Sequence, residues 1–385
     1  MILYIAYAAV GGLFLASAAA SLFHLRWVRR LPQVEQLPSS KEWPTCSVVI
    51  AARNEEHRIE ATIRHLLRQM GVSLEIIVAD DRSSDGTGQI LAQLAAEDSR
   101  VQTLRIDHLP EHWLGKCHAC HLAAGMARGE WLLFTDADCW LKPDVIARAL
   151  AVAQRDAADH VALTPGITPQ TFAAHTWYLM FLTSFLSWIA GVNRDKRGAH
   201  FGLGAFNLVR TSAYRECGGH EALRLTVLDD IRLGLLLHRD GRRTRAFLGA
   251  DDVECHWGTT LHELMRVMEK NYFAALDYRV EVVIAGSGVI SLMLMIIIVG
   301  LLGGTSLGLF AAVSPLMLIV PTIVIARRMS WPVRYALGVP AMFPVFFYAM
   351  FRSAFITLRQ GGIRWRDTFY PLSELRAGNV SQRRR

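Results

Sequence analysis

Acidic side chains follow three short apolar runs in the middle of this 385-residue chain. The first cluster spans residues 53–56, the second is Asp80-Asp81, and the third holds Asp136 and Asp138. For Asp85, in the sequence Asp85-Gly86-Thr87, a turn or helix cap explains the carboxylate equally well. Three acidic clusters together repel each other unless a cation offsets their charge. Their hard oxygen ligands suit Mg²⁺ or Mn²⁺, which would in turn bridge to a diphosphate.

Short apolar runs alternate with amphipathic stretches from Cys46 onward. This alternation predicts a parallel sheet covered by helices on both faces. In such sheets ligands bind at the carboxyl ends of the strands, which is where the acidic clusters fall. The predicted strands cover residues 47–52, 74–79, 101–106 and 131–135, and helices are predicted around residues 59–70 and 90–94, from about 116 and from Pro143.

The composition excludes a fully soluble protein, since 52% of the residues are hydrophobic and only 19% are charged. The excess lies in residues 2–23, 282–302 and 305–326, each about 21 residues long and able to cross roughly 30 Å of hydrocarbon. A fourth run, residues 335–351, is only about 17 residues long and contains two prolines. We therefore expect a multi-pass protein of the inner cell membrane that carries one large domain.

Positive charge places that domain in the cytoplasm, because Arg26, Arg29 and Arg30 follow the first run. The first run is predicted to be an uncleaved anchor, with a removed signal peptide as the alternative. The fourth run is predicted to be re-entrant or interfacial, which keeps the basic tail inside. The predicted domains are an anchor at 1–24, a cytoplasmic domain at 25–281, a membrane region at 282–356 and a basic tail at 357–385.

The net charge of +7 is assigned to contact with anionic lipid head groups. A nucleic-acid partner is not expected, because the central domain lacks a basic stripe interleaved with aromatic residues. The chain has six cysteines, and free thiols are expected in the cytoplasm.

Five motifs together resemble the membrane-attached family 2 glycosyltransferases, whose catalytic domain has the nucleotide-diphospho-sugar, or GT-A, fold. They occupy residues 48–55, 78–87, 113–116, 134–138 and 228–230. Within that family the chain looks most like enzymes that glycosylate lipids such as ceramides, carotenoids or hopanoids. The resemblance implies an α/β, Rossmann-like GT-A domain with transmembrane helices at both ends.

The resemblance also implies a role for each site residue. The nucleotide-sugar donor would be held by Ala52, Arg53, Glu55, Asp80, Asp81, Lys116 and Asp136, with Lys116 acting on the diphosphate as a point charge. The metal ligands would be Asp136 and Asp138, and His256 is either a further metal or phosphate contact or an ordinary core or surface histidine. Asp230 is the expected base for the acceptor hydroxyl, with Asp229 as the alternative.

The implied activity is the inverting, metal-dependent transfer of a single sugar from a UDP-sugar to a membrane lipid. One alternative is a processive polysaccharide synthase, which the missing Arg-Trp pair around residues 264–273 disfavours. The other is a non-catalytic membrane protein that binds nucleotide sugars.

Three further patterns have competing explanations. Residues 117–121 match the pattern for c-type haem attachment, but haem is attached outside the cytoplasm, so a helix with incidental thiols and imidazoles is expected rather than a haem or zinc site. Residues 172–192 are predicted to lie against the membrane or over the acceptor groove, with a core helix as the alternative. Gly202 and Gly204 either line the acceptor side or permit a strand bulge.

Overall fold

The computed structural model describes residues 1–33 and 44–380, so the last five residues of the predicted basic tail lie outside it. The described chain forms two compact units. The sheet unit comprises residues 28–168, 188–257 and 370–385, and the helical unit comprises residues 1–27, 169–187 and 258–369. Each unit is thus assembled from segments that are far apart in the sequence.

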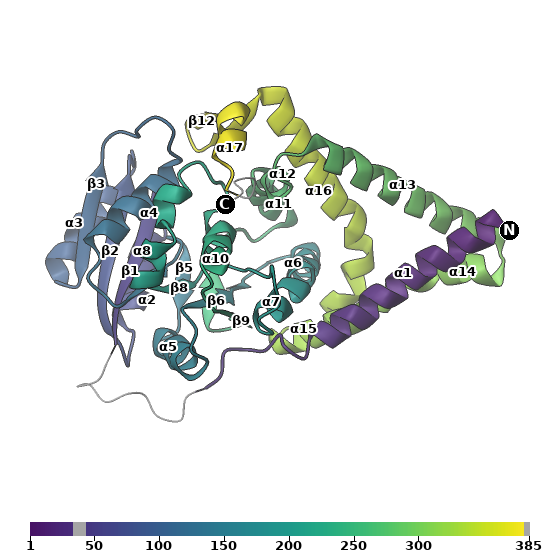
Figure 1. Cartoon of the computed structure of the whole chain (residues 1–385), viewed down its shortest axis with the longest axis horizontal. Coiled ribbons are helices and arrows are strands. Elements are labelled where there is room, and N and C mark those ends of the chain that lie inside the picture. Colours follow the sequence, from purple (N-terminus) through teal and green to yellow (C-terminus); the bar gives the residue numbers. More distant parts are fainter. Residues whose placement is uncertain (34–43, 381–385) are drawn as a thin grey trace. The chain divides into compact units, whose positions relative to one another are not determined.

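A seven-stranded sheet in the order β3-β2-β1-β4-β8-β6-β9 is the framework of the sheet unit (Figure 1). The order and the buried strands confirm the predicted α/β fold. The strand β8, however, runs antiparallel to both β4 and β6, which corrects the expectation of a wholly parallel sheet. The strands are β1 (Thr45–Ala52), β2 (Ser73–Asp81), β3 (Val101–Ile106), β4 (Trp131–Phe134), β6 (His160–Thr164), β8 (Asn207–Arg210) and β9 (Thr244–Leu248).

Helices connect these strands and bury one apolar face each. In α2, Ile59, Ile63 and Leu66 are fully buried, as their helical spacing predicts. Pro143 was predicted to lie in the first turn of a helix. It lies just before that helix instead, because α5 begins at Val145 after an Asp144 N-cap. The helices of this unit are α2 (Ile59–Leu67), α3 (Thr87–Glu97), α4 (Gly115–Met126), α5 (Val145–Arg155), α7 (Leu186–Val192, from Trp188), α8 (Thr211–Glu216), α9 (Gly219–Ala222), α10 (Asp229–Arg239) and α17 (Leu372–Gly378).

A small second sheet contains a disulfide between two cysteines that were predicted to be free thiols. Its strands are β5 (Cys139–Leu141), β10 (Val253–Cys255) and β7 (Gly166–Ile167). Cys139 and Cys255 pair across β5 and β10 and are joined by the disulfide, while Cys46, Cys117, Cys120 and Cys217 are free. The prediction that all six cysteines are free is therefore wrong for this pair.

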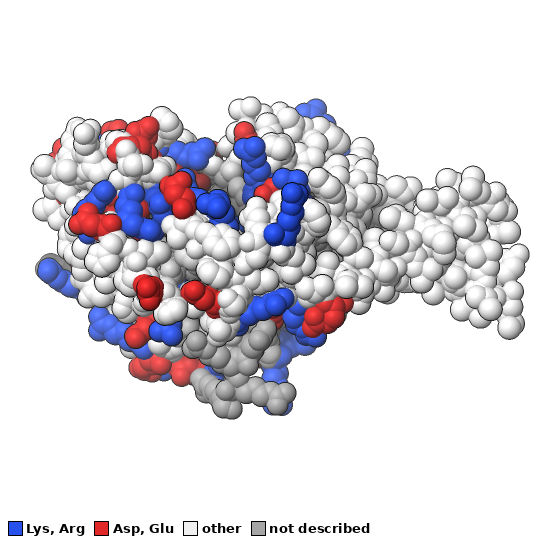
Figure 2. Space-filling view, turned by 90° about the horizontal axis from the view of Figure 1, so that it is seen from above, with Lys and Arg blue, Asp and Glu red and all other residues white. Residues whose placement is uncertain are grey.

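The helical unit holds four stretches that are long and apolar enough to cross a membrane: residues 2–24, 280–303, 306–328 and 333–360. Figure 2 shows a surface without Lys, Arg, Asp or Glu over α1, α13 and α14. The elements are α1 (Ile2–His24), α6 (Phe172–Ser184), α11 (Leu261–Glu269), α12 (Asn271–Ala275), α13 (Val280–Gly303), α14 (Ser306–Val313), η1 (Ser314–Leu318), α15 (Ile319–Arg328), η2 (Val333–Gly338), α16 (Val339–Gln360) and β11 (Gly362–Trp365). The strand β12 (Thr368–Pro371) leads from this unit back to the sheet unit.

The fourth apolar stretch is longer than predicted. It covers 28 residues, since Pro340 fits the first turn of α16 and Pro344 is accommodated inside the helix. The length of residues 333–360 therefore no longer argues against a membrane crossing. The contacts at the two ends of this stretch are the remaining evidence.

Both ends of this fourth apolar stretch form hydrogen bonds or ion pairs with short helices of the same unit: α6 at its start, and α11 and α12 toward its end. At the start, the Thr176 hydroxyl of α6 donates to the Tyr335 carbonyl in η2 at 3.1 Å. Toward the end, Arg352 Nε lies 2.7 Å from Glu269 Oε1, and the Phe273 N–H donates to Ser353 Oγ at 3.0 Å. In Figure 1, α16 accordingly runs from the neighbourhood of α15 to that of α11 and α12.

The predicted helix at residues 172–192 is two helices, because the chain ends α6 at Ser184 and starts α7 at Leu186. The helix α6 buries Ala174 and residues 176–182, and it packs on η2, α15 and α16. Its 13 residues are too few to cross about 30 Å of hydrocarbon. Its packing fits the core-helix alternative, while a position against the membrane or over the acceptor groove stays a prediction.

Candidate functional site

Lys116 lies at the centre of a cluster of carboxylates at the carboxyl edge of the sheet. Its ammonium nitrogen Nζ is 2.8 Å from Asp136 Oδ1 and 3.6 Å from Asp229 Oδ2. Lys116 is the second residue of α4, Asp136 follows β4, and Asp229 is the first residue of α10. A small pocket is lined by Lys116, Cys120, Phe134, Thr135, Asp136, Gly204, Asn207, His220, Asp229 and Asp230. The structure thus brings together Lys116, Asp136, Asp229 and Asp230 from the predicted site residues, together with Gly204.

The attraction between the Lys116 ammonium and the surrounding carboxylates stabilises this cluster. Burial alone would lower the pKa of Lys116, but the charges of Asp136, Asp229 and Asp230 outweigh it and hold that pKa well above its usual value. The lysine is therefore a permanent cation among three carboxylates. It offsets a repulsion that would otherwise oppose folding at this edge of the sheet.

The two neighbouring aspartates have different partners. Asp229 lies between Lys116 and His220, whose Nε2 is 3.5 Å from Asp229 Oδ2. The Tyr214 hydroxyl accepts the backbone N–H of His220 at 3.0 Å and lies 3.0 Å from Nδ1 of the same ring. The hydroxyl proton then goes to Nδ1, so Nε2 carries the imidazole proton and points it at Asp229.

Asp230 is held by backbone groups instead. Its Oδ2 accepts the Gly204 N–H at 2.8 Å, and its Oδ1 accepts the Ile231 N–H at 2.7 Å. Burial, together with the charge of Asp229, raises the pKa of Asp230 to about 6. A carboxylate with such a pKa is ionised near neutral pH and is still basic enough to accept a proton.

Gly204 makes this arrangement possible. A side chain at this position would place its Cβ 2.6 Å from Asp136 Oδ2, so only glycine fits between Asp136 and Asp230. At Gly202, a Cβ would lie 2.1 Å from the Asp230 carbonyl oxygen. Both glycines belong to the loop before β8, so the close approach of Gly204 to the Asp136 carboxylate and of Gly202 to the Asp230 backbone explains them better than a strand bulge.

Asp138 lies near Asp136 and Glu55 in a buried setting. Burial first, and then the charges of these two carboxylates, raise the pKa of Asp138 to about 7. A divalent cation would relieve this repulsion, so the donor set fits one. His256 is adjacent, since its backbone N–H donates to the Asp138 carbonyl at 3.1 Å, while its ring packs on Trp140.

The predicted nucleoside end of the site lies at β2, where Ala52 pairs with Asp80. Asp80 is engaged by Arg105 Nη1 at 2.5 Å and by the Ser83 N–H at 3.2 Å. Asp81 forms a two-bond pair with Arg82, with Nε–Oδ1 at 2.7 Å and Nη2–Oδ2 at 2.9 Å. A Cβ added to Gly115 would lie 2.3 Å from Asp81 Oδ2, so Asp81 is the aspartate beside Lys116 and its helix.

The loop that holds Arg53 and Glu55 is fastened to the loop after β2. The Glu55 N–H donates to Thr87 Oγ1 at 2.8 Å, and the Glu56 N–H donates to Asp85 Oδ2 at 3.2 Å. Asp85 also accepts the Thr87 N–H and hydroxyl. Hydrogen bonding lowers the pKa of Asp85 despite the opposing effect of burial. The turn-and-cap explanation of Asp85 is therefore the one that the contacts favour.

Residues 117–121 do not gather around a common centre. The Cys117 thiol donates to the Thr226 carbonyl at 3.4 Å, while His118 and His121 pack on Trp113. Cys120 instead lies with His220 and Asp229. This agrees with the expected helix with incidental thiols and imidazoles.

Sequence reasoning missed His220 and Asn207. Asn207 Oδ1 is 2.6 Å from His160 Nε2, and its Nδ2 donates to the Asp230 carbonyl at 3.3 Å. Neither residue lies in an acidic strand end, and the segments that carry them come from β8 and the short helix α9. Only the folded arrangement identifies them.

Comparison with known proteins finds that part of this chain is similar to one family of enzymes. The model of glycosyl transferase family 2 matches residues 47–218. The 4,4'-diaponeurosporenoate glycosyltransferase of Staphylococcus haemolyticus is 27% identical over 50% of this chain and 51% of its own length. The beta-monoglucosyldiacylglycerol synthase of Trichormus variabilis is 30% identical over 51% of this chain and 42% of its own length. The chain thus spans about half the length of these curated relatives.

A solved structure shares the fold over most of the chain. It is the mannosyltransferase PcManGT of Pyrobaculum calidifontis in complex with GDP-Man and Mn²⁺, with a TM-score of 0.57 and 15% identity. The match covers 93% of this chain and 99% of that one. At this level of identity the match supports the GT-A fold of the sheet unit.

The charge balance around Lys116 generates a stability prediction. We expect Lys116→Met to lower the free energy of unfolding by about 2 kcal/mol near neutral pH, because it leaves buried carboxylates without their cation. The figure is below the fully buried range because the lysine side chain is 24% exposed. Urea titration of the detergent-solubilised protein, followed by tryptophan fluorescence, would measure it.

The exposed Lys142→Met is the matched control and should leave stability within about 0.5 kcal/mol of the parent. The deficit of Lys116→Met should shrink at about pH 5, since Asp230, whose pKa is raised to about 6, then takes up a proton. An equal deficit at both pH values would show that lost packing, rather than charge, is responsible.

Proposed function

From the match of residues 47–218 to the model of glycosyl transferase family 2, we propose that this protein belongs to that family and transfers a sugar from a nucleoside-diphosphate sugar to a membrane lipid. One observation carries the proposal: Lys116, Asp136, Asp229 and Asp230 share one pocket at the edge of the sheet where such folds bind ligands. The names of both curated relatives refer to lipids. The apolar helices of this chain would keep the enzyme where a lipid acceptor resides.

We propose that Lys116 binds the donor diphosphate and that Asp136 and Asp138 hold Mg²⁺ or Mn²⁺. A bound cation of this kind supplies positive charge that stabilises the departing nucleoside diphosphate. Lys116 acts in the same direction, because its cation lies 2.8 Å from Asp136 and remains charged. His256 lies beside Asp138 and is the third proposed metal contact.

For the nucleoside, we propose Asp81 with Ala52, Arg53, Glu55 and Asp80 around it. Asp81 is favoured over Asp80 as the direct contact because it adjoins Gly115, the residue before Lys116. A carboxylate is a suitable acceptor for the N–H of uracil, which fits a UDP-sugar.

Asp230 is the proposed base. Its neighbour Asp229 is engaged by Lys116 and His220, whereas Asp230 is oriented by two backbone N–H groups and has a raised pKa. Asp230 would take the proton of the acceptor hydroxyl as that oxygen attacks the anomeric carbon and the nucleoside diphosphate leaves from the opposite face. A single displacement of this kind inverts the anomeric centre. We propose that only one sugar is added, because the Arg-Trp pair of processive enzymes is missing around residues 264–273.

The path of the chain between the two units limits which of its apolar stretches can cross the membrane. The chain leaves the sheet unit after residue 257 and returns to it at residue 370. A chain that leaves and rejoins one soluble body crosses the membrane an even number of times in between, yet three apolar stretches lie in this interval. We propose that α13 and α14–α15 cross and that η2–α16 lies in the interface. Both ends of this last stretch are bound to the short helices α6, α11 and α12.

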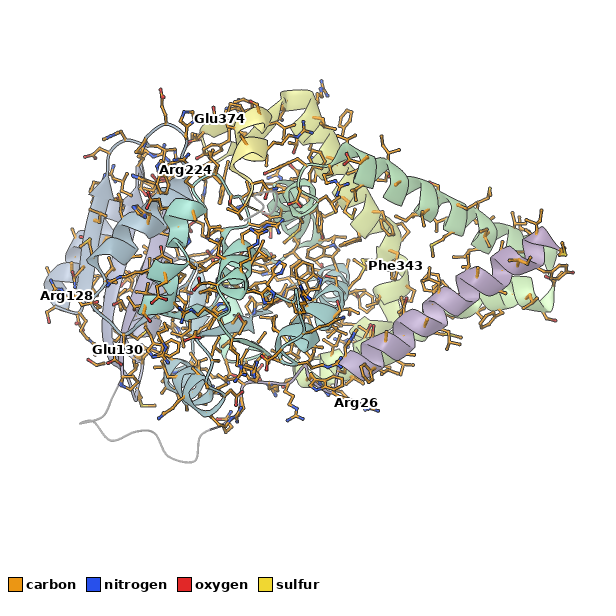
Figure 3. The ribbon with its side chains drawn as sticks, viewed as in Figure 1. Arg26, Arg128, Glu130, Arg224, Phe343 and Glu374 are labelled. Atoms are coloured by element: carbon orange, nitrogen blue, oxygen red, sulfur yellow. A yellow bond between two sulfur atoms is a disulfide. The ribbon has the colours of Figure 1, made fainter. Side chains whose placement is uncertain are left out.

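In this topology α1 brings the chain to the cytoplasmic side. Figure 3 shows Arg26 just beyond the end of α1, where the positive-inside rule places it in the cytoplasm. The enzyme would thus be a multi-pass protein of the inner membrane with a cytoplasmic catalytic unit.

Removing the proposed base tests the mechanism. We expect Asp230→Asn to lower kcat about a thousandfold, because an amide cannot accept the acceptor proton. Membranes would be incubated with labelled UDP-glucose, UDP-galactose, UDP-N-acetylglucosamine or GDP-mannose and MnCl₂, and label in the lipid extract would be counted. Asp107→Asn, whose side chain is 83% exposed, is the matched control. If Asp229→Asn abolished transfer while Asp230→Asn did not, the base would be Asp229.

The raised pKa of Asp230 predicts an acid limb in the pH profile. Below about pH 6 the base becomes protonated, so kcat/KM should fall about tenfold for each further unit of acid. Saturating Mn²⁺ keeps Asp138 ionised during the measurement. A midpoint that moved when the Mn²⁺ concentration was raised further would assign the limb to metal binding instead.

Cysteine labelling tests the topology. In right-side-out vesicles, a membrane-impermeant maleimide should label Leu302→Cys, near the α13–α14 turn, but should label Gln360→Cys only after permeabilisation. Both positions are exposed on the helical unit. The parent protein gives the background from its native thiols. Equal labelling of the two variants in sealed vesicles would mean that α16 crosses the membrane.

A further inference from the structure

The segment that follows the apolar helices is built into the sheet unit. Leu375 is fully buried, and Val380 belongs to the core cluster that contains Leu233 and Leu237 of α10. Arg239 Nη1 also donates to the Val380 carbonyl at 2.7 Å. Figure 1 shows α17, in yellow, within this segment. Residues 370–380 are therefore part of the folded domain.

The first residue of this segment, Tyr370, reaches the donor end of the site. Tyr370 is 7% exposed, and its hydroxyl accepts the Gly115 N–H at 3.1 Å. Gly115 is the first residue of α4 and precedes Lys116. The hydroxyl thus bonds directly to the backbone that carries the proposed diphosphate ligand.

The same hydroxyl adjoins the Asp81–Arg82 pair. The pKa of Arg82 is raised chiefly by its hydrogen bond to Asp81, with a smaller contribution from a hydrogen bond to the Tyr370 hydroxyl. A Cβ added to Gly115 would lie 2.3 Å from Asp81 Oδ2 and 2.8 Å from Arg82 Nη2. Tyr370, Gly115, Asp81 and Arg82 are therefore packed together without spare room.

A second tie holds the loop that leads into α4. Glu374, labelled on α17 in Figure 3, has its Oε2 3.2 Å from His112 Nδ1. The Leu114 N–H donates to the Arg224 carbonyl at 2.7 Å. The entry to α4 is thus fixed by partners from the C-terminal segment and from the loop before α10.

We propose that Tyr370 is a positioning residue of the donor site, whose hydroxyl aligns the backbone before Lys116 with the Asp81–Arg82 pair. The C-terminal segment is then a working part of the nucleotide-sugar site and not only a tail. The inference rests on the proposed function, since it concerns donor binding. Tyr370 acts through Gly115 and Arg82 and makes no proposed contact with the donor.

The full-length, detergent-solubilised protein provides the test, with UDP as the probe in the presence of MnCl₂ and GDP measured in parallel. We expect Tyr370→Phe to weaken nucleotide binding about five- to tenfold in isothermal titration calorimetry, the effect of one lost hydrogen bond. In the transfer assay the donor KM should rise by a similar factor with kcat nearly unchanged. A residue that only supported the fold would not change KM selectively.

Tyr272→Phe is the matched control. Tyr272 is a half-buried tyrosine of the helical unit, and its buried hydroxyl has no hydrogen-bond partner among the described residues. Its removal should leave the nucleotide affinity within about twofold of the parent.

A double-mutant cycle identifies the route of the effect. Arg82→Lys breaks the two-bond pair with Asp81, so adding Tyr370→Phe to it should cost less affinity than Tyr370→Phe alone. If the parent binds UDP or GDP and Tyr370→Phe binds it equally well, the positioning role is wrong while the proposed function stands. If the parent binds neither nucleotide, the proposed function fails, and the role of Tyr370 fails with it.

Discussion

The buried cation of Lys116 is the interaction on which the rest of the site depends. Three carboxylates from different parts of the chain, Asp136, Asp229 and Asp230, meet at one edge of the sheet, and without a positive charge their repulsion would oppose the fold. The three carboxylates also differ in how they contact Lys116. Asp136 takes the short contact, Asp229 shares the lysine with His220, and Asp230 is left to backbone donors.

Close backbone approach is the second constraint. The loop before β8 brings Gly204 between Asp136 and Asp230, where a single added carbon would collide with a carboxylate oxygen. The antiparallel direction of β8 delivers this loop to the carboxyl end of β4. A sheet with only parallel strands would have presented the opposite end of β8 there. The reversed strand is thus part of how the site is assembled.

The apolar helices and the sheet unit are interleaved along the chain. Residues 169–187 leave the sheet unit for the helical unit, and the segment from Tyr370 returns to it. This return limits how many of the apolar stretches between residues 257 and 370 could cross a membrane, and it brings a hydroxyl to the start of α4. Neither consequence was visible in the sequence, because hydropathy reports where apolar residues lie but not which body a following segment joins.

Several features follow from the sequence by itself. Local periodicity located β1, α2, β2, β3 and β4, and the acidic strand ends marked Asp81, Asp136 and Asp138, because short-range patterns reflect local burial. The direction of β8, the contacts of His220 and Tyr370, the separate environments of Asp229 and Asp230, and the Cys139–Cys255 disulfide were decided by tertiary structure alone. The physical reason is that each of these depends on contacts between residues distant in the chain, whose spacing in sequence carries no periodic signal.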